Sequence, residues 1–185
     1  ALLTMPNTKP VIDDPESFAL AQQQLADATA STGVKAYVAP AITKGQKGKE
    51  CVDFAALVKL GAKAFTDDGV GVVADEVMAK AFAASAEFQV PLLQHAEFPG
   101  HGGVLAAGPI QEKLGIKPYP PTAESDMVAR DLKLLKDYPG ASYHVLHVSA
   151  EKTLELIATA KQAGLKASCE VSPHHLLFCS SDIDG

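Results

Sequence analysis

Short apolar runs alternate with longer segments of helical periodicity along the chain. The apolar runs are typical of strands buried in a parallel sheet, and we predict strands at residues 1–5, 34–38, 62–66, 91–94, 142–146 and 166–171. Helices are predicted between them, over residues 15–29, 54–60, 75–88, 123–136 and 151–163. Such alternation predicts an α/β protein with a parallel sheet and right-handed crossovers.

Capping residues indicate where several of these helices begin. Asp14 precedes Pro15, which gives a capping carboxylate followed by proline at the first helical position. Asp53, Thr122 and Ser149 are the predicted caps of the helices that follow them.

Two architectures fit this order of elements, an open doubly wound sheet and a (β/α)8 barrel. No strand is followed by the GxGxxG or phosphate-loop motif of a nucleotide-binding open sheet. Polar residues that can carry chemistry follow the carboxyl ends of different strands: Asn7, Asp68, His95 and His147. Because barrel enzymes build their active sites at that end, we predict a (β/α)8 TIM barrel.

Asp68, His95 and His147 are residue types that bind zinc, and a barrel would bring them together around one axis. Imidazole and carboxylate without thiolate favour a catalytic over a structural metal site. Each residue also has a simpler interpretation, since a histidine after a strand is often only hydrogen-bonded in its loop. Asp67 and Asp68 together are typical of a turn, but strand alternation directs the two carboxylates to opposite sides.

Other polar residues fit the metal site less well. We interpret His144 as a packing or hydrogen-bonding residue that faces away from the metal, and His101 as solvated. His174 and His175 either line the mouth of the site or have a structural role. Alternation places Lys63 opposite Asp68, which argues against a carbamylated lysine that bridges two metals.

Composition narrows the classes of partner. The 185 residues are 47% hydrophobic and 21% charged, with a formal net charge of −6 and no basic run, so nucleic acid is not an expected partner. No apolar stretch approaches the roughly 20 residues that cross a bilayer, so we expect no membrane partner. Cys51, Cys169 and Cys179 are odd in number and lack CxxC spacing, which indicates reduced thiols in a cytoplasmic protein.

Four motifs resemble those of a known family, in the same order and over nearly all of the chain. They are TMPNTKPV at 4–11, GAKAFTDDG at 61–69, HVLHVS at 144–149 and EVSPHHL at 170–176. Together they are similar to the bacterial-type dihydroorotases of the amidohydrolase superfamily of metal-dependent barrels. The resemblance implies a zinc-dependent cyclic amidohydrolase that interconverts L-dihydroorotate and N-carbamoyl-L-aspartate in pyrimidine biosynthesis.

The resemblance also implies roles for individual residues. Asp68 would bridge two zinc ions per complete chain, and His95 and His147 would bind one of them. Asn7 would hydrogen-bond a carboxylate of the small-molecule substrate.

Other parts of the family pattern would lie outside this sequence. The family's His-x-His motif and neighbouring arginine would precede Ala1, and its catalytic aspartate would follow Gly185. We therefore expect residues 1–185 to be an internal segment of a single catalytic barrel domain, an incomplete barrel covering about strands 2–7. Alone, this segment is expected to bind at most one zinc ion weakly and not to turn over substrate.

Alternatives remain at this level. A hydantoinase or allantoinase would share the barrel, although these relatives carry a bridging lysine on the strand that here has Thr66 and two aspartates. A non-catalytic subunit that scaffolds aspartate transcarbamoylase would be expected to have lost the metal ligands. The resemblance is compatible with a homodimer or with association with aspartate transcarbamoylase. Phe98 stands where the family places an acid, at the start of a Gly/Pro-rich loop over residues 98–121.

Overall fold

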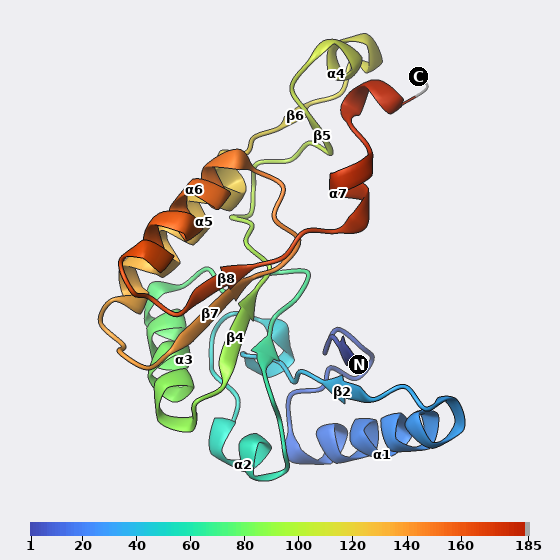
Figure 1. Cartoon of the computed structure of the whole chain (residues 1–185), viewed down its shortest axis with the longest axis vertical. Helices are drawn as coiled ribbons and strands as arrows, with labels where there is room; N and C mark the ends of the chain where they lie inside the picture. The colour runs from blue at the N-terminus through green and yellow to red at the C-terminus, as the bar shows by residue number, and fades with distance from the viewer. Residues whose placement is uncertain (184–185) are drawn as a thin grey trace.

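Parallel strands, with helices packed on one face, make up the centre of the computed structural model, which describes residues 1–183 (Figure 1). A four-stranded parallel sheet has the order β3 (Phe65–Thr66), β4 (Pro91–Gln94), β7 (Ser142–Val145) and β8 (Ala167–Cys169). Strands β1 (Leu2–Thr4) and β2 (Ala36–Val38) form a separate parallel pair, and β5 (Leu105–Ala106) pairs with β6 (Pro118–Tyr119).

Helices connect successive strands of the two main sheets, as a repeating βα chain requires. They are α1 (Pro15–Thr32), α2 (Phe54–Lys59), α3 (Asp75–Phe88), α5 (Thr122–Leu135) and α6 (Glu151–Gln162). The other helical segments are α4 (Pro109–Leu114), α7 (Pro173–Leu177) and the 3-10 turns η1 (Lys44–Gln46) and η2 (Ser180–Asp182).

The two faces of the strands contribute to two separate apolar cores because successive side chains alternate. One face packs against the helices, where Phe65, Leu92 and Tyr143 belong to the main core. The opposite face contributes Ala64 and Leu93 to a smaller cluster with Leu146 and Ala39. Apolar side chains on both faces of parallel strands are the arrangement of a barrel wall, with helices outside and a filled interior.

The predicted caps of α1 and α2 are confirmed. Asp14 accepts a hydrogen bond from the backbone N–H of Ser17 at 2.8 Å and forms a capping box with it. The carboxylate of Asp53 accepts from the N–H of Ala56 at 3.0 Å.

The predicted caps of α5 and α6 are wrong. Thr122 is the first residue of α5 rather than its cap. Helix α6 begins after Ala150, and the side chain of Ser149 caps no N–H group of this helix. The carboxylate of Glu124, from the neighbouring helix α5, instead accepts hydrogen bonds at this end of α6.

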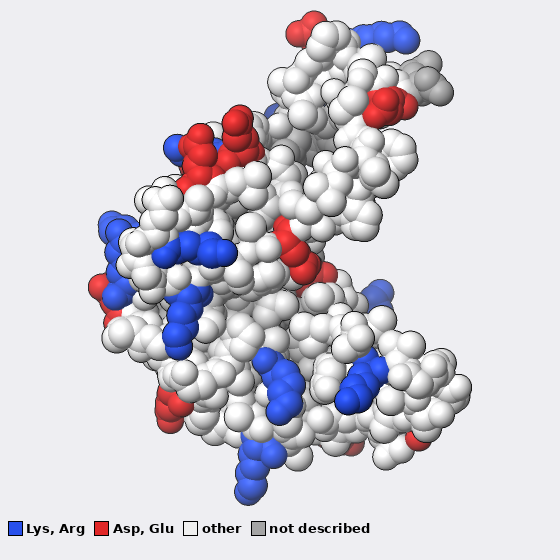
Figure 2. Space-filling view, in the orientation of Figure 1, with Lys and Arg blue, Asp and Glu red and all other residues white. Residues whose placement is uncertain are grey.

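The 98–121 loop contains more structure than its Gly/Pro content predicted. It includes β5, α4 and β6 and projects beyond the end of the main sheet, at the top of Figure 1. On the face shown in Figure 2, lysine and arginine side chains are scattered over the surface and do not gather into one patch. Within residues 1–183, no helix combines the length and apolar character needed to cross a membrane.

Candidate metal centre

Three side chains from three neighbouring strands meet at the carboxyl end of the four-stranded sheet. Asp68 follows β3, His95 follows β4 and His147 follows β7. Because these strands are parallel neighbours, their carboxyl ends lie side by side. Among the described residues, these three form the group of His, Cys, Asp or Glu side chains whose spacing suits a metal ion. We call them the metal-ligand group.

The distances within the metal-ligand group are close to those between the ligand atoms of a zinc ion. His95 Nδ1 lies 3.0 Å from His147 Nε2, and Asp68 Oδ1 lies 3.7 Å from the former atom and 3.5 Å from the latter. Ligand atoms bound tetrahedrally about 2.0–2.1 Å from zinc are about 3.3–3.4 Å from one another. The three atoms can therefore contact one zinc ion with small adjustments and leave a coordination position open.

Both aspartates follow β3, and Asp68 lies in a turn whose backbone N–H groups bond the Asp67 carbonyl, yet the two carboxylates point to opposite sides, as alternation predicts. The Asp67 carboxylate is buried and points to the loop after β2, where it accepts hydrogen bonds from the N–H of Ile42 at 2.8 Å and of Thr43 at 3.0 Å. The Thr43 hydroxyl also donates to it. Asp68 points to the opposite side, with 20% of its side chain exposed. The predicted separation of the two aspartates is thus confirmed in the geometry.

Strand alternation does not predict the direction of the His147 side chain. Leu146 belongs to the interior cluster, so a regular strand would direct the next side chain towards the helices. The backbone of His147 instead adopts a left-handed conformation with φ of 35°, and this turn returns its ring to the site.

His144 lies outside the metal-ligand group, as predicted. Its Nδ1 is hydrogen-bonded to Ser168 Oγ at 2.8 Å, and its Nε2 lies 3.4 Å from a carboxylate oxygen of Glu170. The predicted reason needs correction. His144 borders a cavity of the strand interior together with Leu93, so it is on the interior face but lies on the strand itself, short of its carboxyl end.

The charges of the group favour an ionised carboxylate. Polar contacts with His147 and then with His95 lower the pKa of Asp68 below its ordinary value. The same contact with Asp68 raises the pKa of His147. Glu97 lies behind His95, with a carboxylate oxygen 3.3 Å from its Nε2. This contact suits an imidazole that donates its Nε2–H to Glu97 and keeps the Nδ1 lone pair for a metal.

Asn7 lies beside the metal-ligand group. Its amide Nδ2 donates to Asp68 Oδ2 at 3.4 Å, and the residue is exposed. His174 and His175 are exposed on α7, with ring centroids 4.3 Å apart, and do not belong to the group. Phe98 packs against the main core, and the Arg130 guanidinium lies 5.5 Å from the centre of its ring.

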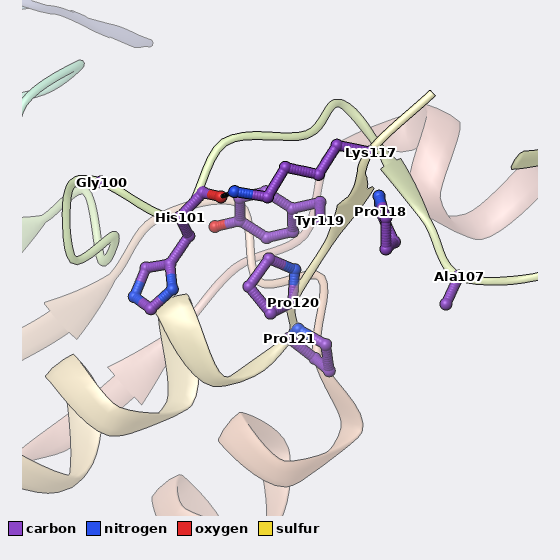
Figure 3. A pocket seen from close by; sticks show the side chains of 8 residues that line it. All are labelled: Gly100, His101, Ala107, Lys117, Pro118, Tyr119, Pro120 and Pro121. Atoms are coloured by element: carbon purple, nitrogen blue, oxygen red, sulfur yellow. Dashed lines mark hydrogen bonds between the residues drawn. The ribbon is translucent and has the colours of Figure 1, made fainter. Parts of the chain in front are cut away.

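A cavity of about 510 Å³ lies elsewhere, in the 98–121 loop (Figure 3). His101, Lys117, Tyr119 and Pro120 are among its lining residues. The Lys117 ammonium donates to the backbone carbonyl of His101. No member of the metal-ligand group lines this cavity, so it is not the candidate site.

Sequence reasoning missed two residues beneath the site, Glu124 and Asp131. Both are buried carboxylates on α5, where the helical pattern alone predicts apolar residues. Their presence at buried positions of an amphipathic helix is the signal that could have found them.

A family model and curated relatives both place this chain in the same protein family. A family model described as "Dihydro-orotase-like" matches residues 1–153. A dihydroorotase of Staphylococcus aureus is 44% identical over 98% of the chain, and the match covers 42% of that relative. The chain therefore spans about two fifths of the length of the curated relatives it matches.

Solved structures support the fold. The L-hydantoinase (dihydropyrimidinase) of Arthrobacter aurescens matches with a TM-score of 0.75 at 21% identity, over 97% of this chain and 41% of that one. A Saccharomyces cerevisiae dihydroorotase in complex with 5-fluoroorotic acid matches with a TM-score of 0.72 at 17% identity, over 100% of this chain and 52% of that one. At such identities the likeness concerns the fold alone, and it confirms the predicted incomplete α/β barrel.

Proposed function

The chain belongs to the dihydroorotase-like family, and we propose that it forms part of a metal-dependent cyclic amidohydrolase. The proposed reaction is the interconversion of L-dihydroorotate and N-carbamoyl-L-aspartate by opening and closing a cyclic amide. The activity is proposed for the intact protein, to which residues 1–185 contribute part of a single catalytic barrel domain. The curated relatives named dihydroorotase, 40–44% identical over 98% of this chain, support this substrate.

The observation that carries the proposal is the triangle of ligand atoms in Asp68, His95 and His147. Its sides of 3.0, 3.5 and 3.7 Å suit a zinc ion, and all three donors are oxygen or imidazole nitrogen. We propose that these residues hold zinc and that Asp68 bridges two zinc ions in the intact protein. Such a metal supplies a Lewis acid for the amide carbonyl and lowers the pKa of water.

The side chains of this site have separate proposed roles. Glu97 would fix the orientation and tautomer of His95, because the imidazole nitrogen remote from the ligand position contacts its carboxylate. Asn7 would bind a carboxylate of the substrate through its amide N–H. That amide donates to Asp68 over a long 3.4 Å contact on an exposed residue, so it is available to an incoming anion.

Two other functions are less well supported. A hydantoinase or allantoinase would place a bridging lysine on β3, where this chain has Thr66 in the strand and Asp68 beyond it. The structural likeness to hydantoinases concerns the fold and gives no substrate. A non-catalytic scaffold for aspartate transcarbamoylase would not need the three ligands, which here lie at metal-binding distances.

We further propose a cytoplasmic protein. Cys51, Cys169 and Cys179 are all free thiols in the structure, which suits a reducing compartment. A homodimer and an association with aspartate transcarbamoylase are the two proposed assembly states, and light scattering of the intact protein, alone and with that enzyme, would distinguish them.

Turnover by the intact protein tests the proposal. We expect activity on L-dihydroorotate, little on hydantoin or allantoin, and a zinc content approaching two per chain. His147→Ala should remove most bound zinc and the activity together, whereas His101→Ala, in the remote loop, should change neither. Preferred turnover of hydantoin, or full activity without bound metal, would overturn the assignment. The separate 185-residue chain should bind zinc without turnover, and dihydroorotase activity from it would refute the incomplete-barrel interpretation.

A further inference from the structure

We propose that helix α5 positions all three members of the metal-ligand group through two buried carboxylates, Glu124 and Asp131. The two residues are seven positions apart on a helix with 3.6 residues per turn, so they lie on the same face. This inference rests on the proposed metal site and concerns what holds its ligands in place.

The burial of these carboxylates requires an explanation. Glu124 is 5% exposed and Asp131 is fully buried. A buried charge is costly unless hydrogen bonds satisfy it, so each carboxylate is expected to have specific donors. For both residues, donors come from chain positions close to a proposed metal ligand: Ser149 and Ala150 follow His147, and Gln94 precedes His95.

Glu124 holds the segment that follows His147. One carboxylate oxygen accepts from the N–H and the hydroxyl of Ser149 at 2.9 and 2.8 Å, and the other accepts from the N–H of Ala150 at 3.1 Å. These amides lie two and three residues beyond His147, whose left-handed backbone directs its ring to the site. Glu124 also places a negative charge at the N-terminus of α6, where the helix dipole favours it.

Asp131 holds the strand that leads to His95. Its Oδ2 accepts from the Gln94 amide at 2.9 Å and from the Tyr143 hydroxyl at 2.8 Å. Gln94 immediately precedes His95, and its side-chain oxygen accepts from the N–H of Val72 at 3.1 Å. The same buried amide therefore connects β4 to the loop that follows Asp68.

Arg130 provides a second connection between Asp131 and the loop that follows Asp68. Its Nε donates to Asp131 Oδ1 at 2.7 Å, while its terminal nitrogens donate to the carbonyls of Val72 and Val73. Gly71 shows how closely the loop and β4 approach. A Cβ at this position would lie 2.5 Å from the carbonyl oxygen of His95, so only glycine fits.

These contacts converge on one helix face. Through Glu124 it holds the turn after His147, and through Asp131 it holds His95 and the loop after Asp68. Outer groups that orient metal ligands typically change metal affinity by roughly 10–100-fold when they are lost. Glu124 and Asp131 are thus positioning residues, since neither is a member of the metal-ligand group.

The test measures zinc affinity and stability in variants of the 185-residue chain. For Glu124→Gln and Asp131→Asn we expect zinc affinity, measured by chelator competition, to fall roughly 10–100-fold. The visible absorption of bound Co²⁺ should change in the same variants, because it reports ligand geometry directly. Ser149→Ala should keep wild-type affinity, since both backbone N–H groups still bind Glu124.

Two controls separate positioning from general destabilisation. Ser85→Ala removes a buried hydroxyl that bonds Val90 and Ser142 at the amino ends of β4 and β7, so it should lower stability and leave zinc affinity unchanged. Glu155→Gln removes an exposed carboxylate from α6 and should change neither quantity.

Each outcome distinguishes the inference from the proposed function. Wild-type zinc affinity in both carboxylate variants would overturn the inference and leave the metal site intact. Absence of zinc binding in the wild-type chain would overturn the metal site itself. If the variants do not fold, amide hydrogen exchange of the wild-type chain decides, because the inference requires slow exchange at Ser149 and Ala150. Rapid exchange at both amides would refute it.

Discussion

Asp67 and Asp68 are neighbours in the chain, but their carboxylates hold different parts of the molecule. Asp67 is buried and connects the end of β3 to the backbone of Ile42 and Thr43. Burial raises the pKa of Asp67, and its hydrogen bonds with Thr43 oppose this effect. Asp68 faces His95 and His147 instead. At the residue scale, the opposite directions of the two carboxylates give Asp67 a structural role and leave Asp68 facing the two histidines.

Substitution of the two aspartates by asparagine should separate these roles. Asp67→Asn keeps the oxygen that accepts from two backbone N–H groups, and its new amide can donate to the Thr43 hydroxyl. We therefore expect near-normal zinc affinity with a loss of about 1 kcal/mol in the free energy of unfolding. Asp68→Asn removes a charged ligand, so its zinc affinity should fall by more than the roughly 10–100-fold typical of outer groups. Chelator competition and urea unfolding measure both, and equal losses of zinc affinity in the two variants would contradict the separation.

Residue types and their places in the sequence predicted that Asp68, His95 and His147 lie together, while their binding of a metal stays a prediction. Asp68, His95 and His147 each follow a predicted strand, and the structure brings them together. The left-handed backbone of His147 could not be predicted, because the alternation of an extended strand contains no signal for it. Asn7 is placed beside Asp68, and its role in substrate binding stays a prediction.

At the element scale, α5 combines two functions on one buried face. Its apolar residues Met127, Val128 and Leu132 pack into the main core, while Glu124 and Asp131 hold loops at the site. The periodicity of the sequence predicts this helix well. It cannot predict the two carboxylates as positioning groups, since their donors come from segments far away in sequence.

The buried Asp131 predicts a pH dependence of stability. Burial raises its pKa from 3.8 to about 6, even though Arg130, Gln94 and Tyr143 hydrogen-bond the carboxylate. Between these values the folded chain retains a proton that the unfolded chain has lost, so the contribution of Asp131 to stability falls as pH rises. Relative to Asp131→Asn, the wild-type free energy of unfolding should decrease by ~3 kcal/mol between about pH 4 and 7 and stay level above that range.

Urea unfolding of the wild-type chain and the Asp131→Asn variant across this pH range measures that difference. A difference that grows with pH would show that the three donors outweigh burial. A constant difference would show that the pKa of Asp131 is the same in the folded and unfolded chain.

At the scale of the whole molecule, the strands form part of a barrel wall with one apolar core on each face. The regular βα alternation predicted a parallel sheet joined by helices, and the polar residues after the strand ends then favoured the barrel over an open sheet. The strand pair and short helix within the 98–121 loop were not predicted. Their segments of two to six residues are too short to show a period.

The central claim is that Asp68, His95 and His147 together bind zinc at the carboxyl end of this wall. X-ray absorption of the separate 185-residue chain loaded with zinc tests it most directly, because the method reports the types of ligand atom and their distances from the metal. We predict a first shell of oxygen and nitrogen at about 2.0–2.1 Å, with the scattering of two imidazole rings. His95→Ala should lose one imidazole from that shell, and Glu155→Gln should not change it. Sulfur neighbours at about 2.3 Å, or a shell unchanged by loss of His95, would contradict the claim.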